Sequence, residues 1–229
     1  MSDKGSRISS ETEAALRREL TAAAARLAET GMCPGSSGNV SVRHGDRIII
    51  TATGADLAAL DPDDLSVLDF DATLLSGPQP SKEYPFHRAF YRRDETLRAI
   101  VHVHSPAASA CSCLEPWSEL SAVPPLTPYF VMRVGQTPLI PYADPGDQAQ
   151  ADSIEASTSM FRAALLGNHG AITAGRTVRE ALDAAVELEH TCDLLLRLGS
   201  RPFRLLPEQT AERLAKKYDS PWGRPRTTQ

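Results

Sequence analysis

Three histidines in this 229-residue chain have the surroundings of metal ligands. His102 and His104 are separated by one residue in an apolar, β-branched run, so on a strand both imidazoles project from the same face. His169 lies between Gly167 and Gly170, which allow a sharp turn that presents its ring. Three neutral imidazoles with an open position are typical of a catalytic zinc site. We therefore expect one divalent cation per subunit, zinc by preference, with manganese or cobalt as alternatives.

The histidines could also have a purely structural role and bind no metal. A His-x-His pair is compatible with two half-buried side chains that are held by hydrogen bonds and bind no metal. His44 lies in a predicted hairpin turn and His190 in a long predicted helix, so both are interpreted as solvated or packed residues. His87 could flank the site, but a place on a helix surface alone predicts nothing. The pattern favours a metal only when the three candidate ligands are taken together.

Glu83 is the candidate acid or base. It lies in the first turn of a helix predicted from Lys82 to about Arg93, and His87 and Tyr91 follow it at intervals of four along one side. A carboxylate in the first turn also interacts favourably with the helix dipole, so a purely stabilising charge is the alternative.

Two short loops have the composition of anion-binding turns. Residues 36–39 (SSGN) place hydroxyls, a glycine N–H and an amide before a predicted strand, and residues 51–54 (TATG) repeat this after the next strand. Ser81 and Lys82 add a hydroxyl and an ammonium at a helix N-terminus. Turn chemistry alone explains either loop. Their joint occurrence predicts a pocket for a small phosphate.

Alternating helices and strands must position these residues. An Ala- and Leu-rich helix of roughly twenty residues ends at Gly31. NVSVR and DRIIIT predict a hairpin, and residues 66–80 a second one, with a helical turn opened by Asp61 between them. The helix that begins near Lys82 leads into the strand RAIVHVH.

The second half continues in the same mixed pattern. SPAASACSCL predicts a helix, and the Pro-rich stretch after it an ordered surface segment or an interface. PLIPYA predicts a short strand, residues 147–163 a helix, and AALLGNHGAITAG two strands around a turn. Thr177 caps a long helix that Gly199 ends. We expect a single domain over 1–229, with a core of about 12–200 and a loose tail from about 208 to 229.

Composition excludes several classes of protein. A net charge of −5 argues against nucleic acid as a partner, because phosphate-backbone binding usually leaves a basic surplus. No stretch has the length of a membrane span or the pattern of a signal peptide, so we expect a cytoplasmic protein without membrane contact. The cysteines are too few and too scattered for a disulfide framework and are interpreted as reduced thiols: Cys33, Cys111, Cys113 and Cys192.

Taken in order, SSGNVSVR, TATGAD, PSKEYPFH, AIVHVHSP and GNHGAI resemble the class II aldolase/adducin family, over about residues 12 to 200. The resemblance implies an α/β fold, a three-layer α/β/α sandwich around a mainly antiparallel central sheet. It also implies a zinc-dependent lyase that assembles as a homotetramer with active sites at subunit interfaces. The implied substrate is a small phosphorylated ketose or sugar acid.

The resemblance assigns roles residue by residue. The metal ligands of the family correspond to His102, His104 and His169, and its acid/base glutamate corresponds to Glu83. Its phosphate contacts correspond to Ser36, Gly38, Asn39, Thr53, Gly54 and Ser81. Apart from the resemblance, Tyr129 is a further candidate acid or an interface residue, with simple packing as its alternative.

Lys82 departs from the pattern of the sugar-phosphate aldolases, which usually have a second serine before the glutamate. An added cation suits a substrate that carries a carboxylate as well as a phosphate. With the segment PPLTPYFVMRVGQTPLIPYADPGD, it makes the chain most similar to a branch that decarboxylates 3-oxo-tetronate 4-phosphates to dihydroxyacetone phosphate and carbon dioxide through a metal-stabilised enediolate.

The same motifs also fit other functions. Within the family they are an aldolase or epimerase acting on fuculose or ribulose phosphate, and a methylthioribulose-phosphate dehydratase. Outside catalysis, an adducin-like scaffold is the alternative. The histidine cluster alone does not separate decarboxylation from aldol cleavage.

Overall fold

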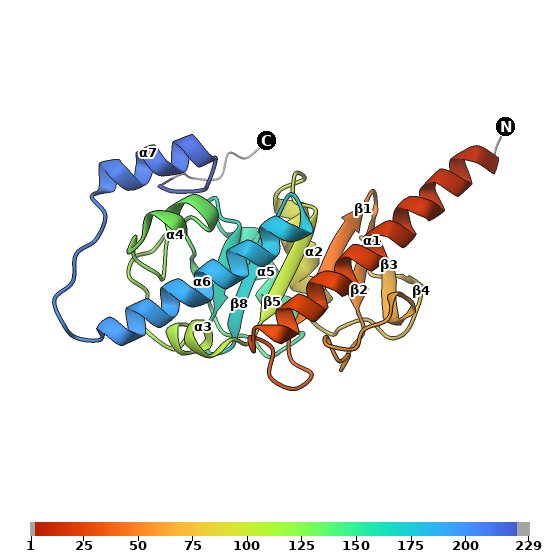
Figure 1. Cartoon of the computed structure of the whole chain (residues 1–229), viewed down its shortest axis with the longest axis horizontal. Helices are drawn as coiled ribbons and strands as arrows, with labels where there is room; N and C mark the ends of the chain where they lie inside the picture. The colour runs from red at the N-terminus through yellow and green to blue at the C-terminus, as the bar shows by residue number, and fades with distance from the viewer. Residues whose placement is uncertain (1–2, 224–229) are drawn as a thin grey trace.

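One eight-stranded sheet runs through the protein (Figure 1), in the spatial order β4-β3-β2-β1-β5-β8-β7-β6. The structure is a computed structural model that describes residues 3–223, with side chains from residue 12 onward. All neighbouring strands pair antiparallel except β6 and β7. The strands are β1 (Asn39–His44), β2 (Arg47–Thr51), β3 (Leu65–Asp69), β4 (Leu74–Ser76), β5 (Ala99–Val103), β6 (Leu139–Ile140), β7 (Ala163–Leu166) and β8 (Gly170–Gly175). The predicted hairpins and the predicted histidine strand are confirmed.

Helices cover both faces of the sheet. One face packs against α2 (Tyr84–Arg93) and α5 (Gln148–Ala156). The other packs against α1 (Asp3–Glu29), α3 (Pro106–Cys111), α4 (Pro128–Arg133), α6 (Val178–Leu198) and α7 (Glu208–Tyr218). Figure 1 shows α1 and α6 crossing this second face. The predicted three-layer α/β/α sandwich is confirmed.

The alternation of side chains along β2 shows why the sheet has two cores. Ile48 and Ile50 point into the core beneath α2 and α5, whereas Ile49 points into the core beneath the other helices. All three side chains are fully buried. Successive residues of a strand face opposite sides, so an unbroken apolar run is what a strand covered on both faces requires.

The long helix α6 begins and ends where the sequence predicts. The Thr177 hydroxyl accepts a hydrogen bond from the Glu180 N–H, and Gly199 takes a positive φ of 55° just after the last turn. Helix α5 is shorter than predicted and covers Gln148–Ala156 rather than residues 147–163, because the backbone leaves the helical conformation at Ser157, which has φ −59° and ψ 132°.

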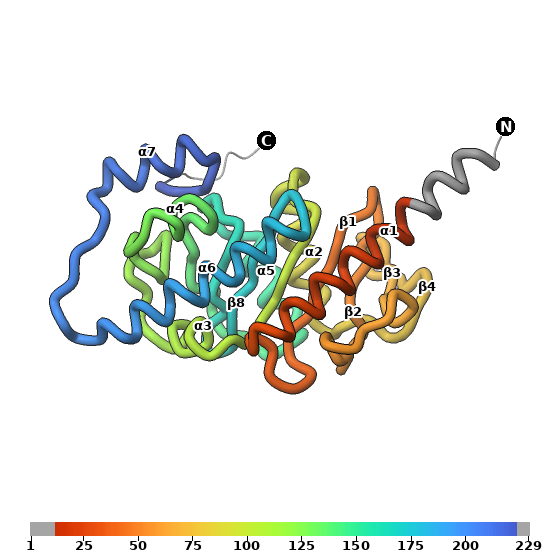
Figure 2. Tube along the Cα trace, viewed as in Figure 1, coloured from red at the N-terminus to blue at the C-terminus, as the bar shows by residue number. Residues whose placement is uncertain are grey.

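The C-terminal segment corrects one prediction. Residues 208–218 form α7 instead of a loose tail, with Ala211 and Ala215 fully buried against α4. Figure 2 shows the extended link that carries the chain from α6 back to this helix. The Gln136 N–H donates to the Pro221 carbonyl oxygen at 2.7 Å, which ties the segment after α7 down as well. Residues 224–229 lie outside the described part of the chain. The prediction weighed polar composition and overlooked the four-residue spacing of the two alanines.

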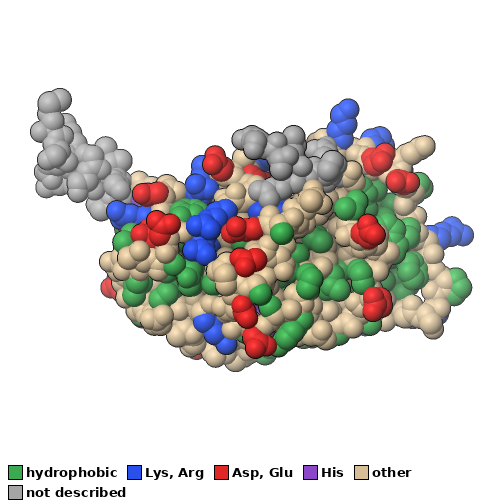
Figure 3. All heavy atoms as spheres, turned by 180° about the vertical axis from the view of Figure 1, so that it is seen from behind, with side chains coloured by type: hydrophobic (Ala, Val, Ile, Leu, Met, Phe, Trp, Pro, Cys, Tyr) green, Lys and Arg blue, Asp and Glu red, His purple; other side chains and the backbone are tan. Residues whose placement is uncertain are grey.

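The surface is mixed in charge. On the face opposite to that of Figure 1, acidic and basic side chains are interspersed (Figure 3). No helix within residues 3–223 is both long and apolar enough to span a membrane.

Candidate active site

Four side chains from separate parts of the chain meet at one end of the sheet. They are Glu83, His102, His104 and His169, and their potential ligand atoms all lie within 4.8 Å of one another. Glu83 directly precedes α2, His102 and His104 lie at the end of β5, and His169 lies in the turn between β7 and β8. The predicted ligands and the predicted acid/base residue are therefore brought together.

Strand β5 fixes the orientation of His102. The strand lies between β1 and β8, and His102 pairs with Asn39 on one side and Ile172 on the other. Its imidazole is fully buried, and its Nδ1 lies 2.9 Å from the Ala171 carbonyl oxygen. Because a carbonyl oxygen only accepts, Nδ1 carries the proton and the Nε2 lone pair faces the cluster, as in most metal-binding histidines.

Helix α3 holds the turn that carries His169. The Ser112 hydroxyl accepts a hydrogen bond from the His169 N–H at 3.2 Å, and the Ser109 hydroxyl donates to the His169 carbonyl oxygen at 3.2 Å. Asn168, within the turn, takes a φ of 55°. Since α3 begins two residues after His104, this short helix links two of the candidate ligands directly.

Gly170 allows β8 to approach β5 at this point. A Cβ there would lie 2.4 Å from the Val103 carbonyl oxygen and 3.4 Å from the His104 Cα, so backbone would have to move. We expect Gly170→Ala to lower the free energy of unfolding by about 1–3 kcal/mol and to weaken metal binding roughly tenfold or more. Denaturation and metal titration of the purified variant measure both effects.

Gly45→Ala is the matched control for Gly170→Ala. Gly45 lies in the hairpin between β1 and β2, and a Cβ there meets nothing within 4 Å, so only backbone strain is added. We expect this control to keep its metal affinity. Equal metal affinities for both variants would contradict the role of Gly170.

The histidine nitrogens are arranged as they would be around a cation. The His104 Nε2 lies 2.8 Å from the His102 Nε2 and 3.1 Å from the His169 Nε2. Burial lowers the pKa of His102 and of His104 below the usual value, and so do the neighbouring imidazoles. His102 and His104 are therefore neutral, and their Nε2 atoms lie together with that of His169, as nitrogens that share one cation would. This donor set fits the predicted divalent metal.

Glu83 is held as a buried carboxylate beside these rings. Its Oε1 lies 3.2 Å from the His169 Nε2, its Oε2 lies 3.5 Å from the His102 Nε2, and the Asn39 Nδ2 donates to Oε2 at 2.7 Å. Burial alone would raise the pKa of Glu83, but the contacts with His169, His102 and Asn39 outweigh it, so the pKa lies well below the usual range. Glu83 is therefore an ionised carboxylate beside the ring nitrogens.

The predicted anion loops border the cluster. The Thr53 N–H donates to the Gln79 carbonyl oxygen at 3.1 Å and the Ser81 N–H to the Thr51 carbonyl oxygen at 3.0 Å, which joins the 51–54 loop to the segment before Glu83. On the other side, a Cβ on Gly38 would lie 2.9 Å from the His102 carbonyl oxygen.

The family assignment follows from a comparison with known proteins. A family model described as Class II Aldolase and Adducin N-terminal domain matches residues 18–196. The chain belongs to this family. The predicted membership is confirmed, and the His-x-His, His-Gly and glutamate positions of this class II aldolase family member form one cluster in space.

The similar proteins include decarboxylases and aldolases. A 3-oxo-tetronate 4-phosphate decarboxylase of Escherichia coli (strain K12) is 41% identical over 85% of this chain and 92% of its own length. The crystal structure of YgbL from Escherichia coli covers 89% of this chain and 99% of its own chain, with 39% identity and a TM-score of 0.84. A 5-deoxy-D-ribulose 1-phosphate aldolase of Bacillus thuringiensis is 32% identical over 89% of this chain and 95% of its own length.

Asn39 has a contact that the family resemblance did not predict. It was assigned to phosphate, but its amide nitrogen donates to Glu83 and its amide oxygen lies 2.5 Å from the His87 Nε2. His87 is fully buried and adjoins the site. The one indication in the sequence was its position four residues after Glu83.

Tyr129 is the one assigned residue that lies apart from the others. It lies on α4, in the opposite helix layer from α2, and is 54% exposed. The Arg133 guanidinium lies 5.1 Å from the centre of its ring. Among the described residues, no contact links Tyr129 to the cluster, so its role as an acid or interface residue stays a prediction.

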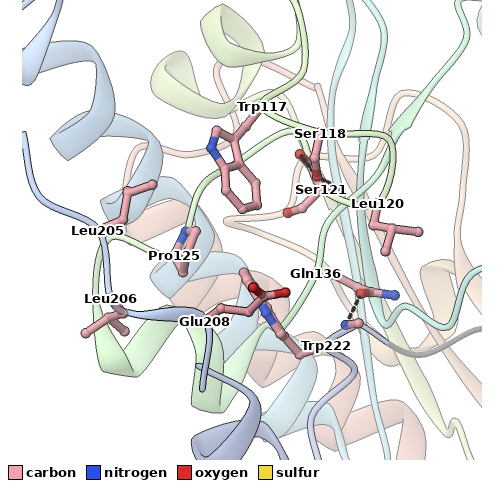
Figure 4. A pocket seen from close by; sticks show the side chains of 11 residues that line it. Trp117, Ser118, Leu120, Ser121, Pro125, Gln136, Leu205, Leu206, Glu208 and Trp222 are labelled. Carbon is pink, nitrogen blue, oxygen red and sulfur yellow. Dashed lines mark hydrogen bonds between the residues drawn. The ribbon is translucent and has the colours of Figure 1, made fainter. Parts of the chain in front are cut away.

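A separate cavity lies near the C-terminal helix. It has a volume of about 400 Å³ and is lined by residues that include Trp117, Pro125 and Trp222 (Figure 4). None of the predicted site residues lines it. In this family member the candidate active site is therefore the cluster of converging ligands, and this cavity is no part of it.

Proposed function

We propose that this protein is a metal-dependent lyase that decarboxylates a 3-oxo-tetronate 4-phosphate to dihydroxyacetone phosphate and carbon dioxide. The observation that carries the proposal is the meeting of three imidazoles with the buried Glu83 carboxylate. Relatives named 3-oxo-tetronate 4-phosphate decarboxylase, 35–42% identical to this chain, support this choice of reaction.

The residues of the cluster divide the work. His102, His104 and His169 would hold the cation, which supplies a Lewis acid that stabilises negative charge on the substrate when bound. Glu83 lies within 3.5 Å of two of these imidazoles. We assign its carboxylate to take up a proton from solvent water and to deliver it to the carbon that has lost carbon dioxide. Loss of carbon dioxide and gain of this proton convert the 3-oxo acid into dihydroxyacetone phosphate.

We assign recognition of the substrate phosphate to the loops beside the cluster. Hydroxyls and backbone N–H groups of these loops are the usual partners of a small anion. The residues are Ser36, Gly38, Thr53, Gly54 and Ser81, with Asn39 engaged at Glu83 instead.

Lys82 is the candidate partner of the substrate carboxylate. It directly precedes Glu83 in the chain, so its backbone adjoins the cluster. Its stem packs on Gly146, where an added Cβ would lie 3.0 Å from the Lys82 carbonyl oxygen and 3.3 Å from its Cβ. A lysine held in this way can pair with a carboxylate next to the metal.

Replacing Lys82 is expected to affect binding more than turnover. Lys82→Met removes the charge, and we expect KM for the sugar-acid phosphate to rise roughly tenfold or more, since hydrogen bonds to charged groups contribute about 1.5–3 kcal/mol. Lys82→Arg keeps the charge and should recover part of the affinity. Steady-state kinetics of both variants decide the matter, and an unchanged KM in Lys82→Met would remove Lys82 from substrate recognition.

An aldolase is the second candidate function. The 32% identical aldolase relative favours it, because the same ligand cluster can stabilise the product of aldol cleavage. Metal-reconstituted protein should be given a 3-oxo-tetronate 4-phosphate and, separately, fuculose and ribulose phosphates. Release of carbon dioxide from the first supports the proposal, and release of aldehyde from the others supports an aldolase. Purified protein that binds no metal and turns over none of them would favour an adducin-like scaffold.

The bound cation, the assembly and the location are further parts of the proposal. Three imidazoles favour zinc over manganese or cobalt. We also propose a homotetramer in the cytoplasm. Metal analysis of purified protein and analytical ultracentrifugation test the first two points.

A further inference from the structure

A buried chain of hydrogen bonds leads from the active-site carboxylate into the core. Its links are Glu83 Oε2 to Asn39 Nδ2 at 2.7 Å, Asn39 Oδ1 to His87 Nε2 at 2.5 Å, His87 Nδ1 to Ser41 Oγ at 2.8 Å, and Ser41 Oγ to Tyr91 OH at 2.8 Å. Each of the four residues beyond Glu83 is at most 4% exposed. The metal and phosphate assignments leave His87, Ser41 and Tyr91 without a role.

Helix α2 and strand β1 supply the residues of this hydrogen-bond chain at regular intervals. Along α2 and the residue before it, Glu83, His87 and Tyr91 are four apart and therefore share one side. Along β1, Asn39 and Ser41 are two apart and therefore face the same side of the sheet. This side of α2 faces β1, so the five polar side chains contact one another within the apolar core between the helix and the sheet.

The Asn39 amide sets the direction of every bond. Its Nδ2 can only donate and faces Glu83 Oε2, and its oxygen can only accept and faces His87 Nε2. His87 therefore carries its proton on Nε2, and its Nδ1 accepts from the Ser41 hydroxyl. The Ser41 oxygen then accepts from the Tyr91 hydroxyl, so all four donors point toward Glu83.

We propose that His87 is a positioning residue that holds the Asn39 amide in the orientation that donates to Glu83, and so sets the carboxylate for proton transfer. This inference rests on the proposed function, in which Glu83 moves a proton. If the amide turned over, its oxygen would face the Glu83 carboxylate at the 2.7 Å contact, and its NH₂ would face the His87 Nε2–H, so two acceptors and two donors would be opposed. Burial also lowers the pKa of His87 to about 3 despite the nearby Glu83 charge, which keeps the imidazole neutral.

Two variants of His87 separate positioning from packing. His87→Leu removes the donor to Asn39, and we expect kcat to fall roughly 10- to 100-fold with KM and metal content close to wild type, as for outer partners of metal sites. His87→Gln places an amide N–H where Nε2 was and should recover most of kcat. Phe90→Leu, on the same buried helix, is the control that loses packing without a polar contact and should keep kcat.

The result that would overturn the proposal is an equal loss of kcat in His87→Leu and His87→Gln, or full activity in both. A second measurement needs no variant. ¹⁵N NMR of histidine-labelled wild-type protein should show His87 as the neutral Nε2–H tautomer, and an Nδ1–H or doubly protonated ring contradicts the inference even if the variants do not fold. Wild-type protein that fails to release carbon dioxide refutes the proposed reaction, while the tautomer still tests the hydrogen-bond chain.

Discussion

Replacement of Glu83 by glutamine is expected to lower kcat by roughly 10²- to 10⁴-fold, the range of a general acid or base. Glutamine keeps the size of the side chain and can still accept from the Asn39 Nδ2, which lies 2.7 Å from Oε2. It cannot take up and return a proton. We expect metal content to stay near that of the wild type, because three imidazoles remain. Steady-state kinetics with metal analysis of the same preparation measure both quantities.

Glu187→Gln is the matched control for this variant. Glu187 is also a buried glutamate, on α6, with its carboxylate 3.7 Å from the Arg133 guanidinium. It has no contact with the histidine cluster among the described residues, so we expect kcat to be unchanged. If Glu83→Gln also kept its kcat within about twofold, Glu83 would not be the acid or base, since that role contributes at least about 10²-fold.

Replacement of His102 by alanine has the second large effect, the loss of both bound metal and turnover. His102 is fully buried, its Nδ1 donates to the Ala171 carbonyl oxygen, and its Nε2 lies 2.8 Å from the His104 Nε2. The alanine variant lacks one imidazole ligand and has a cavity in the core beside β5. We expect the purified variant to contain little metal and to show no measurable turnover. Without bound metal it should also lose the stabilisation that a ligand gives the folded state.

His190→Ala is the control for the loss of a histidine. His190 lies exposed on α6, as the sequence interpretation of a packed or surface residue allowed. We expect wild-type metal content and turnover from this variant. Retained turnover by metal-free His102→Ala would contradict the whole scheme.

The sequence predicted the elements whose pattern is local. The alternation around His102 identified the strand, and the glycines around His169 identified its turn, because strand period and turn chemistry are properties of neighbouring residues. Thr177 and Gly199 marked the ends of α6 for the same reason. The meeting of these segments in space was not available from spacing, and the resemblance to a family supplied it.

The sequence did not predict contacts that depend on packing between distant elements. The link from Asn39 to His87 joins residues 48 positions apart, and it exists only because α2 lies over β1. Helix α7 was missed because its two buried alanines become meaningful only against α4. Tyr129 is exposed on α4, and no contact between described residues links its ring to the cluster, so its sequence position alone implies no catalytic role.

The most direct test of the central claim is turnover of a 3-oxo-tetronate 4-phosphate labelled with ¹³C at its carboxyl carbon. Metal-reconstituted wild-type protein should release one labelled carbon dioxide for each dihydroxyacetone phosphate formed, and Glu83→Gln and metal-depleted protein should release almost none. Labelled carbon that stays in the substrate, together with aldehyde release from a ketose phosphate, would contradict the claim and identify an aldolase.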